Sequence, residues 1–261
     1  MCLTTTKDQS KRIIENHYRD LIIVVCIAIA LIPSTLMATT PVSHEKECVI
    51  LLHGMGKGPS SMNEIETYLA SKGYRTVNFG YPSTDESIER IAEVYIPDAV
   101  AKCPLSPVYK IHFVTHSLGG IIVRQYLQTN SLPEGSRLVM LAPPNQGTEV
   151  VDYVKDFFAY KWIHGPSGQE LGTNPESVPN RLKPIDIEVG IIAGDQSLNP
   201  IFSALIPGPD DGRVSVERAK LEGMTDFLVI SDTHTSVLKN PAVLKQIAYF
   251  LENGKFDHST D

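Results

Sequence analysis

Short apolar runs alternate along this chain with longer segments of mixed polarity. The runs are rich in β-branched residues and end at turn signals, which is typical of strands buried on both faces. Helical segments lie between them, and this alternation predicts a parallel sheet with helices on both faces. We therefore expect an α/β fold with a mostly parallel sheet of about six strands, spanning residues 48–52, 75–79, 110–115, 137–142, 187–193 and 226–230.

Helix boundaries are marked most clearly at two places. Ser61 and Glu64 have the spacing of a capping box, and Gly73 is expected to end the helix that this box begins. Pro241 is expected to open the last helix and Gly254 to close it. A chain of 261 residues with 42% apolar side chains can bury one full core. The pattern therefore predicts a single α/β domain behind the N-terminal leader.

Residues 1–38 read as that leader. Basic side chains precede an apolar run over residues 21–32, and a cleavage site is expected after Ala38. This pattern predicts a signal peptide, or else an uncleaved signal anchor that contacts the membrane through residues 21–37; the run is short for a membrane span. Either outcome exports the domain of residues 39–261, as a periplasmic or secreted protein or as one anchored in the inner membrane.

The sequence Thr-His-Ser-Leu-Gly-Gly, residues 115–120, joins an expected strand to an expected helix. A serine on such a sharp turn has the geometry of a nucleophile elbow, because the turn exposes the hydroxyl and aims the first helix amides at the same place. Thr115 replaces the first glycine of the usual Gly-x-Ser-x-Gly pattern. Taken alone, Ser117 is more readily explained as a turn residue, so other motifs must decide.

One such motif lies upstream, where the first apolar run ends in His-Gly-Met-Gly, residues 53–56. Glycines in this loop allow backbone conformations that expose an amide N–H. We expect the amides of Met55 and Leu118 to form an oxyanion hole, in which two fixed donors stabilise a developing negative charge. The alternative is an ordinary Gly-rich loop.

Two further motifs lie downstream. Asp211 belongs to Asp-Asp-Gly-Arg-Val in a turn, and His234 follows the last expected strand in Asp-Thr-His-Thr. A histidine there can reach the elbow as a general base, and an aspartate can orient its ring. Each residue also has a simpler explanation, since Asp-Gly is a common turn and His234 fits a surface position. The order of all four motifs favours the catalytic interpretation.

In these four motifs the chain resembles the α/β-hydrolase superfamily and, within it, small bacterial lipases and esterases. The resemblance covers residues 46–254 and implies a serine hydrolase of carboxylic esters, with small-molecule or lipid esters as substrates. It implies Ser117 as nucleophile, His234 as base and Asp211 as acid, acting through an acyl-enzyme intermediate. No cofactor is required, and no spacing suggests a metal site.

The acid has rivals. Asp195 follows another expected strand, where many hydrolases of this fold carry the acid, and it is the main alternative. Asp211 is favoured because its Asp-Gly-x-Val context matches the family. Asp210 is a weaker alternative, and Asp232 is too close to His234 in a tight turn.

Residues 143–186, between the fourth and fifth expected strands, form a candidate cap or lid. Apolar residues from Val150 to Phe158 recur at helical spacing, and Trp162 lies nearby. The simpler interpretation is a helix packed on the sheet, and the other is a cap that lines an acyl pocket.

Export changes the interpretation of the cysteines. The domain keeps Cys48 and Cys103, an even pair in an oxidising compartment. In this fold both should lie at the edge of the sheet opposite the elbow, which predicts a Cys48–Cys103 disulfide, with two buried thiols as the alternative.

Charge narrows the list of partners. Without residues 1–38 the chain keeps 19 basic against 27 acidic side chains, a net charge of −8, which argues against nucleic acid as a partner. Two other function classes stay open: an acyltransferase or amidase with the same triad, and a non-catalytic binding module of the same fold. The presence of every triad member argues against the binding module.

Overall fold

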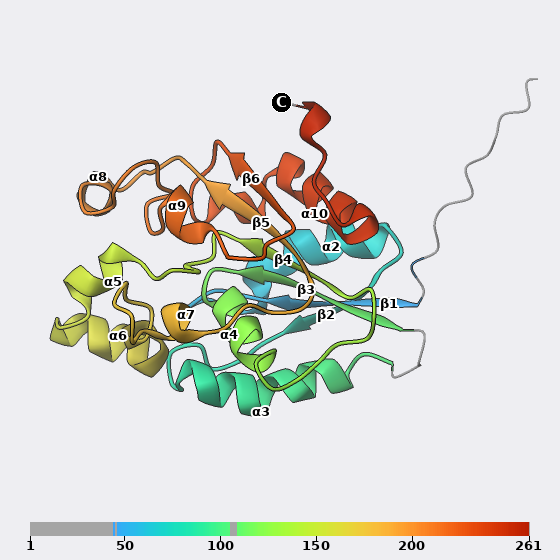
Figure 1. The fold of residues 1–261 in the computed structure, drawn as a ribbon, viewed down its shortest axis with the longest axis horizontal. Coiled ribbons are helices and arrows are strands. Elements are labelled where there is room, and N and C mark those ends of the chain that lie inside the picture. Colours follow the sequence, from blue (N-terminus) through green and yellow to red (C-terminus); the bar gives the residue numbers. More distant parts are fainter. Residues whose placement is uncertain (1–43, 45, 105–108, 261) are drawn as a thin grey trace, which may run out of the picture. The chain divides into compact units, whose positions relative to one another are not determined.

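Six parallel strands form a single sheet at the centre of the fold (Figure 1). The computed structural model describes residues 44, 46–104 and 109–260. The strands lie in the order β2-β1-β3-β4-β5-β6, and every neighbouring pair is parallel. The expected α/β fold is therefore confirmed. The strands are β1 (Glu47–Leu52), β2 (Arg75–Phe79), β3 (Lys110–His116), β4 (Arg137–Leu141), β5 (Glu188–Gly194) and β6 (Asp226–Ile230).

The two faces of the sheet bury two separate hydrophobic clusters. Along β1, Cys48, Ile50 and Leu52 belong to one cluster, whereas Val49 and Leu51 belong to the other. This is the period of two that a strand imposes on its side chains. The first cluster includes buried residues of α3 (Ile88–Ala101) and α4 (Leu118–Tyr126), and the second includes those of α2 (Asn63–Ser71) and α10 (Pro241–Asn253).

The last helix follows the sequence prediction, and the first follows it only at its end, where Gly73 has a positive φ of 91°. Asn240 caps α10 by accepting a hydrogen bond from the Ala242 amide, and Gly254 ends it with a positive φ of 72°. The capping box is wrong, because a 3-10 turn, η1 (Pro59–Met62), precedes α2. Inside that turn the Ser61 hydroxyl donates to the Gly58 carbonyl oxygen at 2.7 Å instead of capping a helix.

The long connection after β4 contains more than one helix. The structure has α5 (Glu149–Val154) and α6 (Phe158–Gln169), which is kinked at Gly165, followed by α7 (Val178–Arg181). Val151 is buried in the core, but Phe158 is 84% exposed, so α6 is not the sheet-packed helix of the simpler interpretation. The remaining helices are α8 (Pro200–Ser203) and α9 (Val216–Ala219), with 3-10 turns η2 (Ser236–Leu238) and η3 (His258–Thr260).

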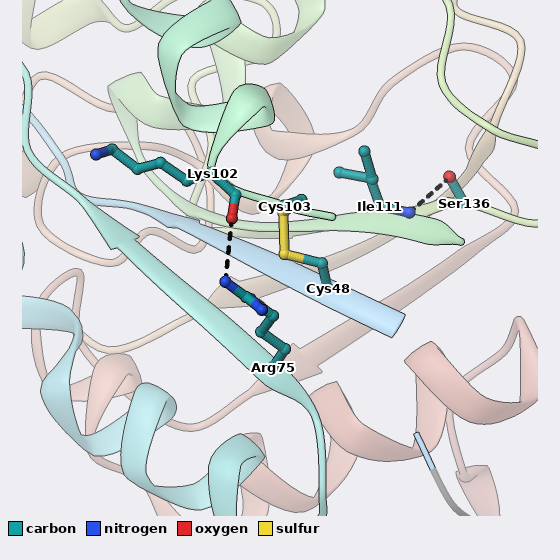
Figure 2. Close-up of a disulfide and its surroundings, with 6 residues drawn as sticks. All are labelled: Cys48, Arg75, Lys102, Cys103, Ile111 and Ser136. Carbon is teal, nitrogen blue, oxygen red and sulfur yellow. Dashed lines mark hydrogen bonds between the residues drawn. A yellow bond between two sulfur atoms is a disulfide. The ribbon is translucent and has the colours of Figure 1, made fainter. Parts of the chain in front are cut away.

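The expected disulfide is confirmed. Figure 2 shows Cys48, at the start of β1, joined to Cys103, which follows α3. The bond lies at the amino ends of the strands, away from the elbow at the carboxyl end of β3. The predicted leader lies outside the described residues. No helix within the described residues is long and apolar enough to cross a membrane.

Candidate active site

The four motifs meet at the carboxyl ends of the strands. Ser117 follows β3 and precedes α4, with φ 52° and ψ −120°. A positive φ is rare for a residue with a side chain and indicates local strain of the kind found at functional sites. The Ser117 amide donates to the Leu141 carbonyl oxygen at the end of β4, 2.9 Å away, which fixes the turn to the sheet.

Two glycines allow the loop after β1 to lie against this turn. A β-carbon on Gly119 would come within 2.8 Å of the Leu52 carbonyl oxygen and 2.9 Å of the His53 carbonyl oxygen. A β-carbon on Gly54 would come within 2.7 Å of His116 Nδ1. The helix start therefore packs against backbone at Gly119, and the loop packs against the His116 ring at Gly54, which a side chain at either glycine would prevent.

Ser117, His234 and Asp211 form one chain of hydrogen bonds. His234 Nε2 lies 3.1 Å from Ser117 Oγ, and His234 Nδ1 lies 2.8 Å from Asp211 Oδ2. A carboxylate only accepts, so Nδ1 carries the ring proton and Nε2 is free to accept the Ser117 proton. This arrangement can transfer the hydroxyl proton to the imidazole and stabilise the resulting positive charge.

Asp211 is itself held in place by its own turn. Its Oδ1 accepts hydrogen bonds from the amides of Arg213 at 2.9 Å and Val214 at 2.8 Å. Its backbone oxygen accepts from the His234 amide at 2.9 Å. This bond joins the turn of residues 210–214, the acid turn, directly to the loop that carries His234. Both side chains are buried, and their hydrogen-bond directions are therefore fixed.

The rival carboxylates lie elsewhere. Asp195 is partly exposed and accepts a hydrogen bond from the side chain of Gln196. Asp210 accepts from the Gly212 amide at 2.7 Å and the Ser203 hydroxyl at 2.9 Å, which makes it part of the turn. Asp232 accepts from the Asn240 side chain at 2.9 Å. Only Asp211, among the carboxylates of the described residues, is within hydrogen-bond distance of the His234 ring.

The two residues expected to supply the oxyanion hole belong to the two segments that meet at Ser117. Met55 belongs to the loop after β1 and lines the same cavity as Ser117. Leu118 is the first residue of α4, so its amide has no acceptor within the helix. Among the described residues, neither amide has a hydrogen-bond acceptor, as the expected role requires.

His116 also holds the site together, although no sequence motif pointed to this role. Its Nε2 donates to the His234 carbonyl oxygen at 2.8 Å, which ties the histidine loop to the elbow. Burial, together with the nearby His234, lowers the pKa of His116 to about 3, so the ring stays neutral. Its place between Thr115 and Ser117 was visible in the sequence, but its partner, 118 residues away, was not.

His53 and Tyr81 hold the loop after β1. Their rings stack with centroids 4.2 Å apart, and the Tyr81 hydroxyl donates to the His53 carbonyl oxygen. His53 Nδ1 donates to the Gly54 carbonyl oxygen at 2.9 Å. Burial lowers the pKa of His53, and the loop that carries Met55 is thereby fixed by a neutral histidine.

A cavity of about 210 Å³ opens beside Ser117 and His234. Its walls are mostly apolar and come largely from the segment between β4 and β5, together with α8 and the acid turn. Two cationic residues, Lys57 and Arg213, also line it. The apolar wall consists of Val150, Val151, Val154, Leu171, Phe202 and Val214.

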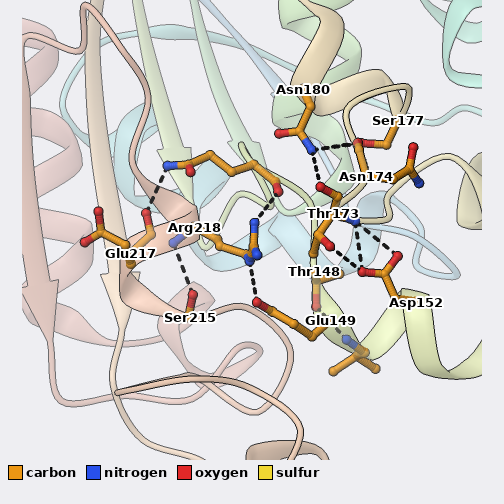
Figure 3. A network of polar contacts seen from close by, with 12 residues as sticks. Thr148, Glu149, Asp152, Thr173, Asn174, Ser177, Asn180, Ser215, Glu217 and Arg218 are labelled. Carbon is orange, nitrogen blue, oxygen red and sulfur yellow. Dashed lines mark hydrogen bonds and ion pairs between the residues drawn. The ribbon is translucent and has the colours of Figure 1, made fainter.

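A polar network fixes the base of this wall (Figure 3). Glu149 pairs with Arg218 of α9. The Thr148 hydroxyl also donates to the Arg213 carbonyl oxygen. On the other side of α5, Asp152 accepts from the Thr173 amide at 3.1 Å and 3.2 Å. The segment after β4 is therefore anchored directly to the turn that holds Asp211.

The outer surface of α5 and α6 is unusually apolar. Five large hydrophobic side chains are exposed there, and two more are exposed at α8. A contiguous group of such residues is typical of a contact with a lipid or protein surface. They are Tyr153, Phe157, Phe158, Trp162 and Ile163 on α5 and α6, and Leu198 and Ile201 at α8.

No arrangement suited to a metal ion is found in the described part of the chain, where no three His, Cys, Asp or Glu side chains are grouped to hold one. Comparison with known sequences gives no match: no protein-family model matches the chain. No curated protein matches it in sequence either.

Solved structures, in contrast, share the fold. The mature lipase BlEst2 of Bacillus licheniformis is 17% identical with a TM-score of 0.63, and the match covers 79% of this chain and 92% of that one. The metagenomic carboxyl esterase MGS0156 is 20% identical with a TM-score of 0.61, over 81% and 77% of the two chains. Phospholipase PlaB from Legionella pneumophila, in complex with thio-NAD, is 16% identical with a TM-score of 0.61. That match covers 78% of this chain but 57% of PlaB. The chain therefore has the α/β-hydrolase fold and resembles bacterial lipases and esterases in structure.

Proposed function

We propose that this protein is a serine hydrolase that cleaves carboxylic esters, with Ser117 as nucleophile, His234 as general base and Asp211 as the orienting acid. The observation that carries this proposal is the hydrogen-bond chain from Ser117 Oγ through both ring nitrogens of His234 to Asp211, beside an apolar cavity. The lipases and esterases of the same fold support the reaction class.

The reaction proceeds in two halves. Ser117 Oγ attacks the ester carbonyl carbon while its proton moves to His234 Nε2, and the carbonyl oxygen becomes an anion held by the amides of Met55 and Leu118. The C–O bond to the alcohol breaks, and the alcohol leaves with the proton from His234. Water then gives a proton to His234 and attacks the acyl-enzyme, which releases the acid and restores Ser117.

The acyl group occupies the apolar cavity, with residues 143–186 as its cap. Val150, Val151 and Leu171 form a wall that suits a hydrocarbon chain. The exposed aromatic rings on α5 and α6 favour lipid esters over small polar ones, because aromatic side chains partition to the boundary between lipid and water. A lipid ester is therefore the preferred substrate class.

We also propose that the domain acts outside the cytoplasm. The basic and apolar pattern of residues 1–38 has the form of an export signal or anchor. The Cys48–Cys103 bond supports this location, since disulfides persist in oxidising compartments.

The direct test is hydrolysis of p-nitrophenyl esters from acetate to palmitate by the wild type and by Ser117→Ala. We expect turnover in the wild type and a loss of at least about 10⁴-fold in the variant. Ser71→Ala, which alters an exposed serine on α2, is the matched control and should retain full activity. Equal turnover by wild type and Ser117→Ala would overturn the proposal. Adding a competing alcohol separates hydrolysis, which gives free acid, from acyl transfer, which gives a new ester.

A further inference from the structure

The two cationic residues of the cavity have no acidic partner. Lys57 lies on the loop after β1, two residues beyond Met55, and Arg213 lies on the acid turn, two residues beyond Asp211. Both residues are exposed. Within the described part of the chain neither forms an ion pair, and no Asp or Glu lines the cavity. A bound group of negative charge would therefore meet two unneutralised cations there.

Both cations stand on backbone that is fixed relative to Ser117. The Arg213 amide donates to Asp211 Oδ1 at 2.9 Å, and the Arg213 carbonyl oxygen accepts from the Thr148 hydroxyl. The Lys57 amide donates to the Gly54 carbonyl oxygen at 3.2 Å. One charge thus lies on the acid turn and the other on the loop after β1. The same two segments also carry Asp211 and Met55.

Their positive field reaches the residues inside. Burial lowers the pKa of His164, and the charge of Arg213 lowers it further. Burial raises the pKa of Tyr160 to about 12, while Arg213 acts in the opposite direction. Both rings line the cavity, so the charge of Arg213 acts on other side chains of the same cavity.

This local charge is opposite to that of the whole chain, which carries a net charge of −7. A cleft lined by one sign of charge raises the local concentration of ligands of the other sign, even on a protein whose overall charge repels them. Guanidinium binds phosphate through paired hydrogen bonds, and ammonium binds it as a point charge.

We infer that the substrate is an acyl ester whose alcohol part carries a phosphate group, with the acyl chain against the apolar wall and the phosphate between Lys57 and Arg213. This inference rests on the proposed ester hydrolysis and names the substrate class of the same site. The phosphate belongs either to a lipid headgroup or to a small soluble phosphate ester, and the chemistry of recognition is shared.

The test compares matched esters that differ only in the phosphate: 1-hexanoylglycerol 3-phosphate and 1-hexanoylglycerol. The measured quantity is the ratio of their kcat/KM values in the wild type, Lys57→Met, Arg213→Gln and the double variant. We expect the wild type to prefer the phosphate ester, each single variant to lower the ratio about fivefold to tenfold, and the double variant to remove the preference. Added salt should lower the wild-type ratio because it screens exposed charges.

Lys161→Met is the matched control, because Lys161 is an exposed cation on α6 that does not line the cavity. It should leave the ratio unchanged. The palmitoyl forms of the two esters, which aggregate, distinguish the sources: a larger phosphate preference with palmitoyl than with hexanoyl esters indicates a lipid headgroup, and an equal preference indicates a soluble phosphate ester.

An unchanged ratio in the double variant, or a wild-type preference for the neutral ester, would overturn the inference while Ser117-dependent hydrolysis of the neutral ester continued. Loss of the proposed function itself looks different, because then neither ester would be cleaved in a Ser117-dependent way.

Discussion

The two ends of the same sheet are built differently. At the amino ends of the strands, polar groups are paired: Lys110 contacts Glu47 at 3.1 Å, Arg137 contacts Glu188 at 2.6 Å, and a disulfide closes the start of β1. At the carboxyl ends, Ser117 holds a strained backbone conformation beside an open cavity.

This difference indicates that the amino ends of the strands stabilise the fold and the carboxyl ends carry the reacting groups. A residue held at positive φ costs on the order of 1–3 kcal/mol, and it persists only where the surrounding structure determines it. The paired groups and the covalent bond at the opposite end help to supply the stability that offsets this cost. Changes at the carboxyl ends should therefore reduce activity with little effect on stability, and changes at the amino ends should do the reverse.

The largest effect among the variants that test this comparison is expected for Asp211→Asn. An amide can still accept from the two turn amides, but its NH₂ group faces His234 Nδ1 and forces the wrong ring tautomer. We expect kcat/KM for p-nitrophenyl butyrate to fall about 10⁴-fold while the melting temperature changes little. Asp195→Asn, at the rival carboxylate, is the control and should keep nearly full activity. A larger loss in the Asp195 variant would assign the acid differently.

Removing the disulfide tests the opposite end. The bond closes a loop between residues 55 positions apart, for which constraint of the unfolded chain is worth about 4 kcal/mol at most. The double variant Cys48→Ser, Cys103→Ser should lose about 2–4 kcal/mol of unfolding free energy in urea denaturation, with kcat at 25 °C nearly unchanged. Reduction of the wild type should reproduce the loss. A variant of full stability and low activity would contradict the separation.

The smallest effect is expected at Glu47. Burial opposes ionisation of this carboxyl, but hydrogen bonds and charge attraction from His112 and Lys110 outweigh burial and lower its pKa to about 2. Because the folded pKa lies below the ordinary glutamate value of 4.5, the stabilisation is complete above pH 4.5 and is lost as the pH falls toward 2.

Glu47→Gln should therefore lower the unfolding free energy by about 1–2 kcal/mol at pH 7, less than the full pKa shift implies because the side chain is partly exposed. The difference between wild type and variant should shrink as urea titrations move below pH 4.5. A difference that grows in acid would have the wrong sign for this pairing.

The sequence predicted some parts of this molecule far better than others. Strand positions were within about one residue, because a strand buried on both faces is a continuous apolar run. The turn motifs located the loops that meet beside Ser117, since parallel strands bring their carboxyl ends to one edge.

Other features depend on contacts that no local pattern carries. The hydrogen bond of His116 joins residues 118 positions apart. Lys57 and Arg213 each resemble ordinary surface charges until the fold brings them to one cavity. The apolar spacing after β4 suggested one helix, but a break between Lys155 and Phe157 divides the segment into α5 and α6.

The most direct test of the central claim is the site of labelling by a fluorophosphonate, which reacts with a serine activated as a nucleophile. After trypsin digestion, peptide mapping should place one label on residues 111–124, in which Ser117 is the single serine. Labelling should be absent in Ser117→Ala and strongly slowed in His234→Ala. A label on another serine, or undiminished labelling of Ser117→Ala, would contradict the claim that Ser117 is the activated nucleophile of this protein.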